Sequence, residues 1–230
     1  MLSVPIFNYN ILAIHIYRVL RGLCYGKKFS ALAGLCGVLV PLIGLGTVFL
    51  AVSYSPNFNW TINWISDLAG IYVSPMFPSR PDVSTPTTAM ILNTGLLLSG
   101  IFSFLFAIGL WNSMKIPSGR IGSLIIIIAS IALFNIGLFP EPTGIPHVIA
   151  SLSYFILAPI GILYIGAALM DSGHKPLGYS MLILGIIGII FGGPLVYFGA
   201  IPELISIISV SIFLLIIGIR MYRRAPKPIM

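Results

Sequence analysis

The chain alternates between long apolar stretches and short polar segments. An α-helix of about 20 residues crosses a hydrocarbon layer of roughly 30 Å, and six apolar stretches have this length. Because a backbone inside a bilayer must satisfy its own hydrogen bonds, the pattern predicts an all-α integral membrane protein, folded as a six-transmembrane-helix bundle. The expected spans are residues 30–53, 87–111, 121–139, 147–170, 177–199 and 202–219.

The composition narrows the class of protein further. Apolar residues make up 58% of the 230-residue chain and charged residues only 7%. Soluble domains carry about 25% charged residues, so this balance is typical of a chain embedded in a bilayer. The formal net charge is +7, but the basic residues stand beside the spans and do not form one face. We therefore expect membrane lipids as partners, and no nucleic acid.

Basic residues are distributed unequally between the two sides of the predicted bundle. Six spans place both termini on one side, which carries eleven of the twelve Lys and Arg residues, whereas the other side carries only Arg80. The positive-inside rule then predicts a multi-pass protein of the cell membrane with a cytoplasmic N-terminus and a cytoplasmic C-terminus. The eleven are Arg18, Arg21, Lys27, Lys28, Lys115, Arg120, Lys175, Arg220, Arg223, Arg224 and Lys227.

Three regions follow from these patterns. Residues 1–29 place their apolar side chains on one helical face, which predicts an amphipathic helix lying in the inner headgroup layer. Residues 30–220 form the six-helix transmembrane domain, with one long outer loop at 54–86, and residues 221–230 form a basic cytoplasmic tail. Within the loop, Trp60 and Trp64 are one helical turn apart, a spacing that predicts an aromatic anchor at the outer membrane surface.

The stretch FNIGLFPEPTGIPHVIASLSYF, residues 134–155, forms the outer hairpin between the third and fourth spans. Pro140 ends one helix, and Pro146 suits the first turn of the next. The turn itself requires neither Glu141 nor His147. Two interpretations stay open: His147 hydrogen-bonds Asp67 and fastens the long loop to the hairpin, or Asp67, Glu141 and His147 converge in an outer vestibule that handles a proton or a cation.

Further polar residues lie within the predicted spans. Asn93 and Asn135 lie in the second and third spans, and Tyr154 shares a helical face with His147 in the fourth. Polar groups at such depths usually face the bundle interior and mark functional paths. Glu203, at the start of the last span, is explained by the preference of a helix N-terminus for negative charge.

Three short motifs carry a family resemblance: NWISDLAG, ILNTGLLLSG and GLFPEPTGIPH. The chain resembles the uncharacterised bacterial and archaeal membrane family numbered 998 among the domains of unknown function. Its first motif is also similar to that of the eukaryotic Frag1/DRAM/Sfk1 six-helix family. The resemblance implies a six-helix bundle and no particular activity, and Ala69 stands where the family pattern has glycine. The matching positions are Ser66, Asp67, Asn93, Gly137, Pro140 and His147.

Enzymatic and cofactor chemistry find little support in the sequence. Catalytic zinc usually takes three protein ligands, and the outer side offers a single histidine, so we expect no metal. Adjacent Ser66 and Asp67 could not easily reach opposite ring nitrogens of one histidine, which argues against a catalytic triad. Paired haem-type histidines, CxxC and Rossmann motifs are absent from the sequence, so no cofactor is expected.

Three functions remain in view. We expect a non-enzymatic membrane protein that binds a lipid or apolar ligand between its helices, or that serves as a subunit of a larger membrane complex. The alternatives are a proton-coupled transporter and a lipid-modifying enzyme. The candidate ligand-binding or structural cluster on the outer side consists of Ser66, Asp67, Asn93, Asn135, Glu141, His147 and Tyr154.

Overall fold

The computed structural model describes residues 27–73, 79–193, 195 and 198–223. Within these residues, the chain forms six helices that are long and apolar enough to cross a membrane, which confirms the predicted all-α six-helix class. They are α2 (Lys27–Ser53), α3 (Pro86–Ser113), α4 (Pro117–Leu138), α5 (Ile145–Asp171), α6 (Lys175–Gly192) and α7 (Ala200–Arg223).

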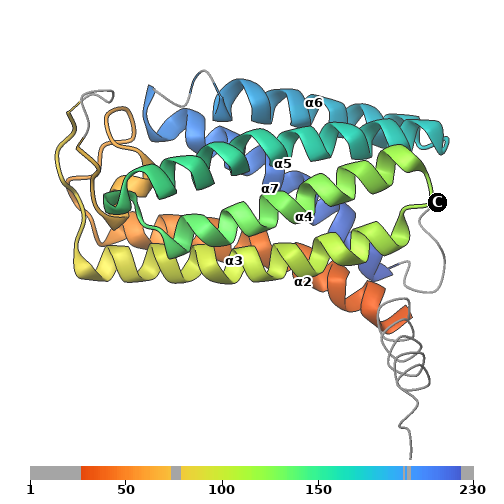
Figure 1. The fold of residues 1–230 in the computed structure, drawn as a ribbon, viewed down its shortest axis with the longest axis horizontal. Coiled ribbons are helices and arrows are strands. Elements are labelled where there is room, and N and C mark those ends of the chain that lie inside the picture. The colour runs from red at the N-terminus through yellow and green to blue at the C-terminus, as the bar shows by residue number, and fades with distance from the viewer. Residues whose placement is uncertain (1–26, 74–78, 194, 196–197, 224–230) are drawn as a thin grey trace, which may run out of the picture.

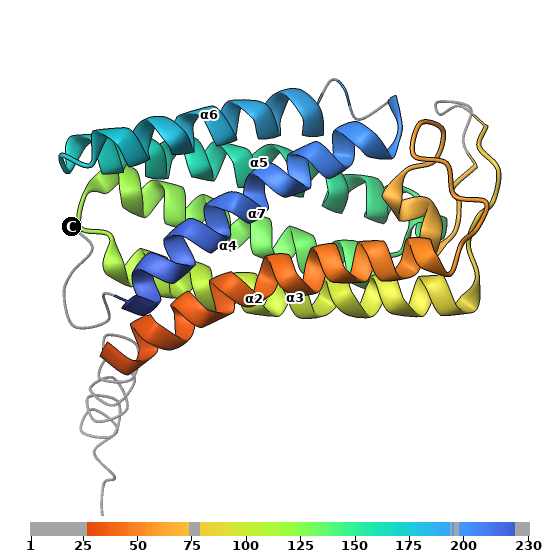
Figure 2. The ribbon, with the colours of Figure 1, turned by 180° about the vertical axis from the view of Figure 1, so that it is seen from behind.

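The helices form a closed ring. Each packs against the next along the chain, and α7 packs against α2 (Figures 1 and 2). The described loop residues between α2 and α3, 54–73 and 79–85, cover one end of the bundle, which we call the loop end. Two short 3-10 helices, η1 (Ile65–Ala69) and η2 (Glu141–Thr143), also lie there. The beginning of α2 and the end of α7 lie at the opposite end (Figure 1).

Sequence signals at the helix ends explain these boundaries. A proline stands in the first turn of α3, α4, α5 and α6, where its missing N–H costs no hydrogen bond. Thr85 caps α3, because its side chain accepts a hydrogen bond from the backbone N–H of Thr88 at 3.1 Å. Gly144 joins η2 to α5 with a φ of +73°, a conformation that strongly favours glycine.

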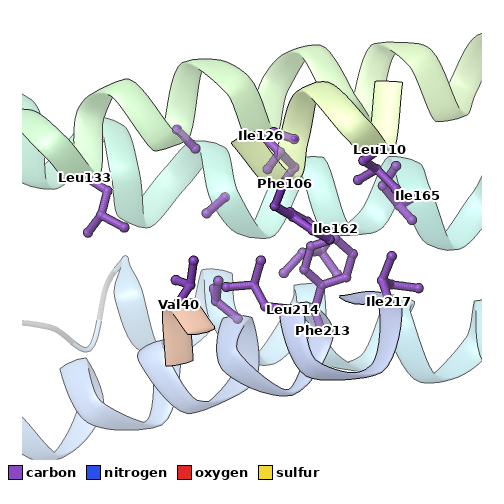
Figure 3. Close-up of a cluster of buried hydrophobic side chains, with 14 of the residues drawn as sticks. Val40, Phe106, Leu110, Ile126, Leu133, Ile162, Ile165, Phe213, Leu214 and Ile217 are labelled. Carbon is purple, nitrogen blue, oxygen red and sulfur yellow. The ribbon is translucent and has the colours of Figure 1, made fainter. Parts of the chain in front are cut away.

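The half of the bundle away from the loop end is densely packed. Phe106 of α3 and Phe213 of α7 meet edge to face at its centre, with ring centroids 6.0 Å apart (Figure 3). Small residues bring the helices together where lipid provides no hydrophobic force between them. A Cβ atom on Gly34 of α2 would lie only 2.6 Å from the carbonyl oxygen of Gly218 of α7. The ring of helices therefore closes by direct backbone approach.

Some boundaries differ from the sequence expectation. The fifth span was expected to reach residue 199, but α6 ends at Gly192, shortly before the proline at position 194. Proline cannot continue the backbone hydrogen bonding of a helix. The interfacial helix predicted for residues 1–29 lies almost wholly outside the described residues, as does the basic tail beyond residue 223.

Candidate functional site

The loop is held onto the helix ends by buried hydrogen bonds. The Thr88 hydroxyl of α3 donates to the carbonyl oxygen of Leu68 at 2.7 Å, and the N–H of Ile65 donates to the Glu203 carboxylate of α7 at 2.8 Å. These bonds place η1 directly over the opening of the bundle. Because its backbone groups at Ile65 and Leu68 are hydrogen-bonded to the helices, this part of the loop is an integral part of the fold.

Arg80 is the centre of the charged cluster at the loop end. Its Nε lies 2.9 Å from Asp67 Oδ2, its Nη2 lies 3.0 Å from Asp67 Oδ1, and the same Nη2 lies 2.7 Å from Glu141 Oε1. The guanidinium also stacks on the Trp64 ring, 3.6 Å from its centroid. The Arg80 guanidinium thus binds the Asp67 carboxylate of the loop through two nitrogens and, at the same time, the Glu141 carboxylate of the hairpin.

Asp67 is fully buried, and it is well compensated. Besides the Arg80 fork, its carboxylate accepts hydrogen bonds from Asn63 Nδ2 at 3.0 Å and from the N–H of Trp64 at 2.9 Å. The Trp64 ring also packs on the Arg80 guanidinium, and the role of Trp60 and Trp64 as an anchor at the outer membrane surface stays a prediction. A buried charge requires this kind of complete hydrogen bonding.

Glu141 joins the hairpin to the loop. Its Oε2 accepts a hydrogen bond from the Ser66 hydroxyl at 2.5 Å, and its Oε1 accepts from the N–H of Tyr72 at 3.3 Å. Burial raises the pKa of the Glu141 carboxyl from 4.5 to about 7, and the nearby Asp67 charge adds to this, against the opposing effects of Ser66 and Arg80. Glu141 is therefore placed to bind and release a proton near neutral pH.

His147 does not pair with Asp67, so the predicted contact between them is wrong. The ring Nδ1 lies 2.8 Å from the Phe139 carbonyl oxygen, and Nε2 lies 3.2 Å from the Ser151 hydroxyl. Because a carbonyl oxygen only accepts, Nδ1 carries the proton, and in the neutral ring Nε2 accepts from Ser151. His147 thus ties the first turn of α5 to the end of α4. The residue that fastens the loop is Arg80.

A chamber with polar groups in its walls lies beneath the loop, and we call it the polar chamber. Leu152 borders this chamber and is 43% exposed at the surface of the bundle. The chamber has room for several water molecules. Its walls come from the loop, the hairpin and three helices: Trp64, Ser66, Tyr72, Glu141, His147, Val148, Ser151, Leu152, Phe155, Gly192 and Glu203.

A second chamber continues toward the bundle centre, and we call it the apolar chamber. Four residues border both chambers: Ser66, Ser151, Phe155 and Glu203. Below them the walls are mainly aliphatic and come from α2, α3, α4, α5 and α7. Val40, Leu133 and Leu214 border it and also belong to the packed core of Figure 3, so they form its floor.

The family of the chain follows from a comparison with family models. The model described as "Protein of unknown function (DUF998)" matches residues 35–220. The chain belongs to the DUF998 family. No curated protein and no solved structure matches it. The matched region begins within α2 and ends within α7, so it includes most of the described bundle with the loop and the hairpin. The similarity to the Frag1/DRAM/Sfk1 family stays a prediction.

The other predicted residues of this DUF998 protein are spread over the bundle. Tyr154 is buried and borders the apolar chamber. Asn135 lies instead in a shallow groove between α4 and α5. Asn93 lies at the contact of α3 with α4. A Cβ on Gly137 of α4 would be 2.8 Å from the backbone carbonyl oxygen of Asn93. Neither asparagine borders the two chambers.

Two charged residues of this DUF998 site were missed or misassigned from the sequence. In the sequence analysis, Arg80 served only to predict the membrane orientation of the bundle. As the single basic residue on the loop side, it could also have been identified as the partner of the acidic residues there. Glu203 was explained by helix capping, but its carboxylate accepts from Ile65 of the loop. Within the described part of the chain, no group of three His, Cys, Asp or Glu side chains is arranged to hold a metal ion.

Proposed function

We propose that this protein binds a membrane amphiphile inside the bundle, with the polar head in the polar chamber and a hydrocarbon segment in the apolar chamber. The observation that carries the proposal is the direct succession of the two chambers, which share four wall residues. Binding sites of small molecules are typically mostly apolar with a few polar groups that fix orientation.

The wall chemistry supports this orientation of the ligand. Carboxyl and hydroxyl groups are gathered in the polar chamber, where Glu141, Glu203 and Ser151 can form hydrogen bonds with a head group. The apolar chamber offers mainly aliphatic walls, and burial of hydrocarbon there gains about 0.8 kcal/mol per methylene group. The exposed Leu152 gives a route from the surrounding lipid.

The charge distribution supports the placement of the loop end outside the cell, as the positive-inside rule predicts. We therefore propose that the ligand enters from the outer leaflet of the cell membrane. The chambers are small, with room for several water molecules each, so we propose that they enclose the head group and a short hydrocarbon segment and not a whole lipid. A role as a subunit of a larger complex is compatible with such binding.

Two glycines of α2 provide a matched test. A Cβ on Gly44 would meet only the Ser99 hydroxyl, at 3.5 Å, and both residues border the apolar chamber. A Cβ on Gly46, which is exposed on the same helix, would meet no atom within 4 Å. Gly44→Leu therefore fills the chamber without a backbone clash, whereas Gly46→Leu adds the same side chain outside it.

The measurement is the amount of amphiphile that stays bound during purification in mild detergent, quantified by mass spectrometry of extracts. We expect the wild type and Gly46→Leu to retain a stoichiometric ligand, and Gly44→Leu to retain about tenfold less, which corresponds to about 1.4 kcal/mol of binding free energy. Equal retention by the two variants, or a ligand-free wild type that stays folded, would contradict the proposal.

A proton-coupled carrier is a second candidate, and one observation favours it. The raised pKa of Glu141, about 7, allows that carboxyl to change protonation near neutral pH at the proposed outer entrance. A liposome assay with a pH-sensitive dye would test it: proton movement that depends on an added amphiphile and is lost in Glu141→Gln supports transport. Identical traces for wild type and variant would remove Glu141 from any such mechanism.

A further inference from the structure

We propose that the head group recognised in the polar chamber is a primary ammonium. The proposal rests on the proposed function, since it specifies which class of amphiphile the chamber binds. Its basis is the chemistry of the chamber wall and one buried carboxylate whose hydrogen bonding is incomplete.

The wall of the polar chamber combines negative and aromatic groups. It contains two carboxyl groups, Glu141 and Glu203, the rings of Trp64 and Tyr72, and two serine hydroxyls. None of the described residues that line it is Lys or Arg. His147 presents its accepting Nε2 side to Ser151, so the imidazole is satisfied without a positive charge. Carboxylates and aromatic faces attract cations and repel phosphate or carboxylate head groups.

Glu203 is the residue aimed at the ligand. Its side chain is 8% exposed, and Oε2 accepts the hydrogen bond from the Ile65 N–H. Within the described residues, Oε1 has no hydrogen-bond partner, and Glu203 borders both chambers. This oxygen is not one of the fully enclosed polar atoms of the described residues, so a ligand in the chamber can reach it, and an ammonium N–H would supply a charge-assisted hydrogen bond there. The position is the junction at which head and chain of an amphiphile would meet.

The neighbouring cluster holds more carboxyl groups than cations among the described residues. Three buried carboxyl groups, those of Asp67, Glu141 and Glu203, interact electrostatically around the guanidinium of Arg80. Arg80 is engaged with Asp67 and Glu141. A divalent metal is disfavoured as the cation, because the described residues hold no suitable group of three ligands. An ammonium requires fewer anionic ligands, and it can also rest against the Trp64 and Tyr72 rings.

The experiment compares three single-chain probes of equal length: hexadecylamine, hexadecanol and hexadecanoic acid. Each is added at the same concentration to the full chain in detergent, and bound adducts are quantified by native mass spectrometry. We expect at least about tenfold more hexadecylamine than hexadecanol on the wild type, and hexadecanoic acid below both, because one charge-assisted hydrogen bond is enough for a tenfold difference.

Glu203→Gln removes the charge but keeps an oxygen that can accept from Ile65. We expect this variant to lose about tenfold in hexadecylamine binding while hexadecanol binding stays unchanged. Asp82→Asn is the matched control, because Asp82 is an exposed loop residue that does not border either chamber. Its carboxylate accepts a hydrogen bond from the N–H of Ser84. Its hexadecylamine binding should equal that of the wild type. Melting temperatures of both variants check that the fold is intact.

The outcomes separate this proposal from the proposed function. Equal binding of hexadecylamine and hexadecanol, or full hexadecylamine binding by Glu203→Gln, would overturn the ammonium proposal and leave amphiphile binding standing. Binding of none of the three probes would overturn both. Ethylammonium chloride, added as a competitor, distinguishes a free amine from an amphiphile: displacement of hexadecylamine at equal concentration would show that the chain is not recognised and would overturn the assignment to an amphiphile.

Discussion

Arg80→Met removes the cation that joins the loop to the hairpin. The substitution leaves the Asp67 and Glu141 carboxyl groups buried, at 0% and 3% exposure, without the guanidinium that binds both. Removal of one partner from a buried ion pair typically costs about 3–5 kcal/mol, because the remaining charge has no water to compensate it. Methionine has a similar length and adequate flexibility, so the loss of packing is minor.

The assay is thermal unfolding of the detergent-solubilised protein, followed by the fluorescence of its tryptophans. For chains of this size, 1 kcal/mol corresponds to roughly 2–4 °C, so we expect Arg80→Met to lower the melting temperature by about 6–20 °C. Arg223→Met is the control, since Arg223 is exposed at the end of α7, and it should shift by less than about 2 °C. The triple variant with Asp67→Asn and Glu141→Gln should recover most of the loss, because no buried charge is then left uncompensated.

Equal melting temperatures of Arg80→Met and Arg223→Met would show that Arg80 does not stabilise the buried carboxyl groups. So would a triple variant that is less stable than Arg80→Met alone, because the loss would then come from packing and not from unpaired charge. Arg80→Lys gives an intermediate test. A lysine keeps the charge but lacks the fork that reaches Asp67 through two nitrogens, so about half of the loss is expected.

Three further predictions follow from individual contacts. Because the folded-state pKa of Glu141 is about 7 and its unfolded value is 4.5, its contribution to stability is complete below about pH 4.5 and is lost as the pH rises through 7, by roughly 3 kcal/mol. The melting temperature of the wild type should therefore fall between pH 4.5 and pH 8, and that of Glu141→Gln should fall less steeply; parallel curves would contradict this. Gly34→Ala should lower the free energy of unfolding by about 1–3 kcal/mol, since its Cβ would lie 2.6 Å from a carbonyl oxygen of α7, whereas Gly46→Ala, measured in the same denaturation series, should cause no loss. In a cysteine-free background, a membrane-impermeant maleimide should label Val73→Cys, 89% exposed at the loop end, and not Tyr222→Cys, 57% exposed at the other end; the reverse result in intact cells would invert the proposed orientation.

The bundle could be predicted from the sequence because its signals are local. Each span is a continuous apolar stretch of sufficient length, and prolines and a threonine cap stand at the helix starts. The neighbouring positions of α3, α4, α5 and α6 are then favoured by the short connections between them. The end of α6 was missed by seven residues, because the apolar residues that follow Gly192 in the sequence continue the hydropathy signal beyond the helix end.

The site could be predicted only in part, because its contacts join distant residues. Arg80 meets Glu141 across 61 positions, and Glu203 meets Ile65 across 138. The spacing of apolar and polar residues along the chain does not predict contacts between residues so far apart in sequence. Asp67, Glu141 and His147 were identified as exceptional polar residues, and all three lie at the loop end. The partners of these residues were not predicted. A histidine near a carboxylate in the sequence suggests an ion pair, but His147 instead bonds to the backbone carbonyl of Phe139 in its own hairpin.

Whether an amphiphile occupies the two chambers can be seen in a structure of the protein in lipid nanodiscs. We predict elongated non-protein density that begins between Glu141 and Glu203, passes Phe155 and continues along the aliphatic walls toward Leu214. The Gly44→Leu variant should lack the part of this density that lies in the apolar chamber. Chambers filled only by separate water molecules, with identical density in the variant, would contradict the account.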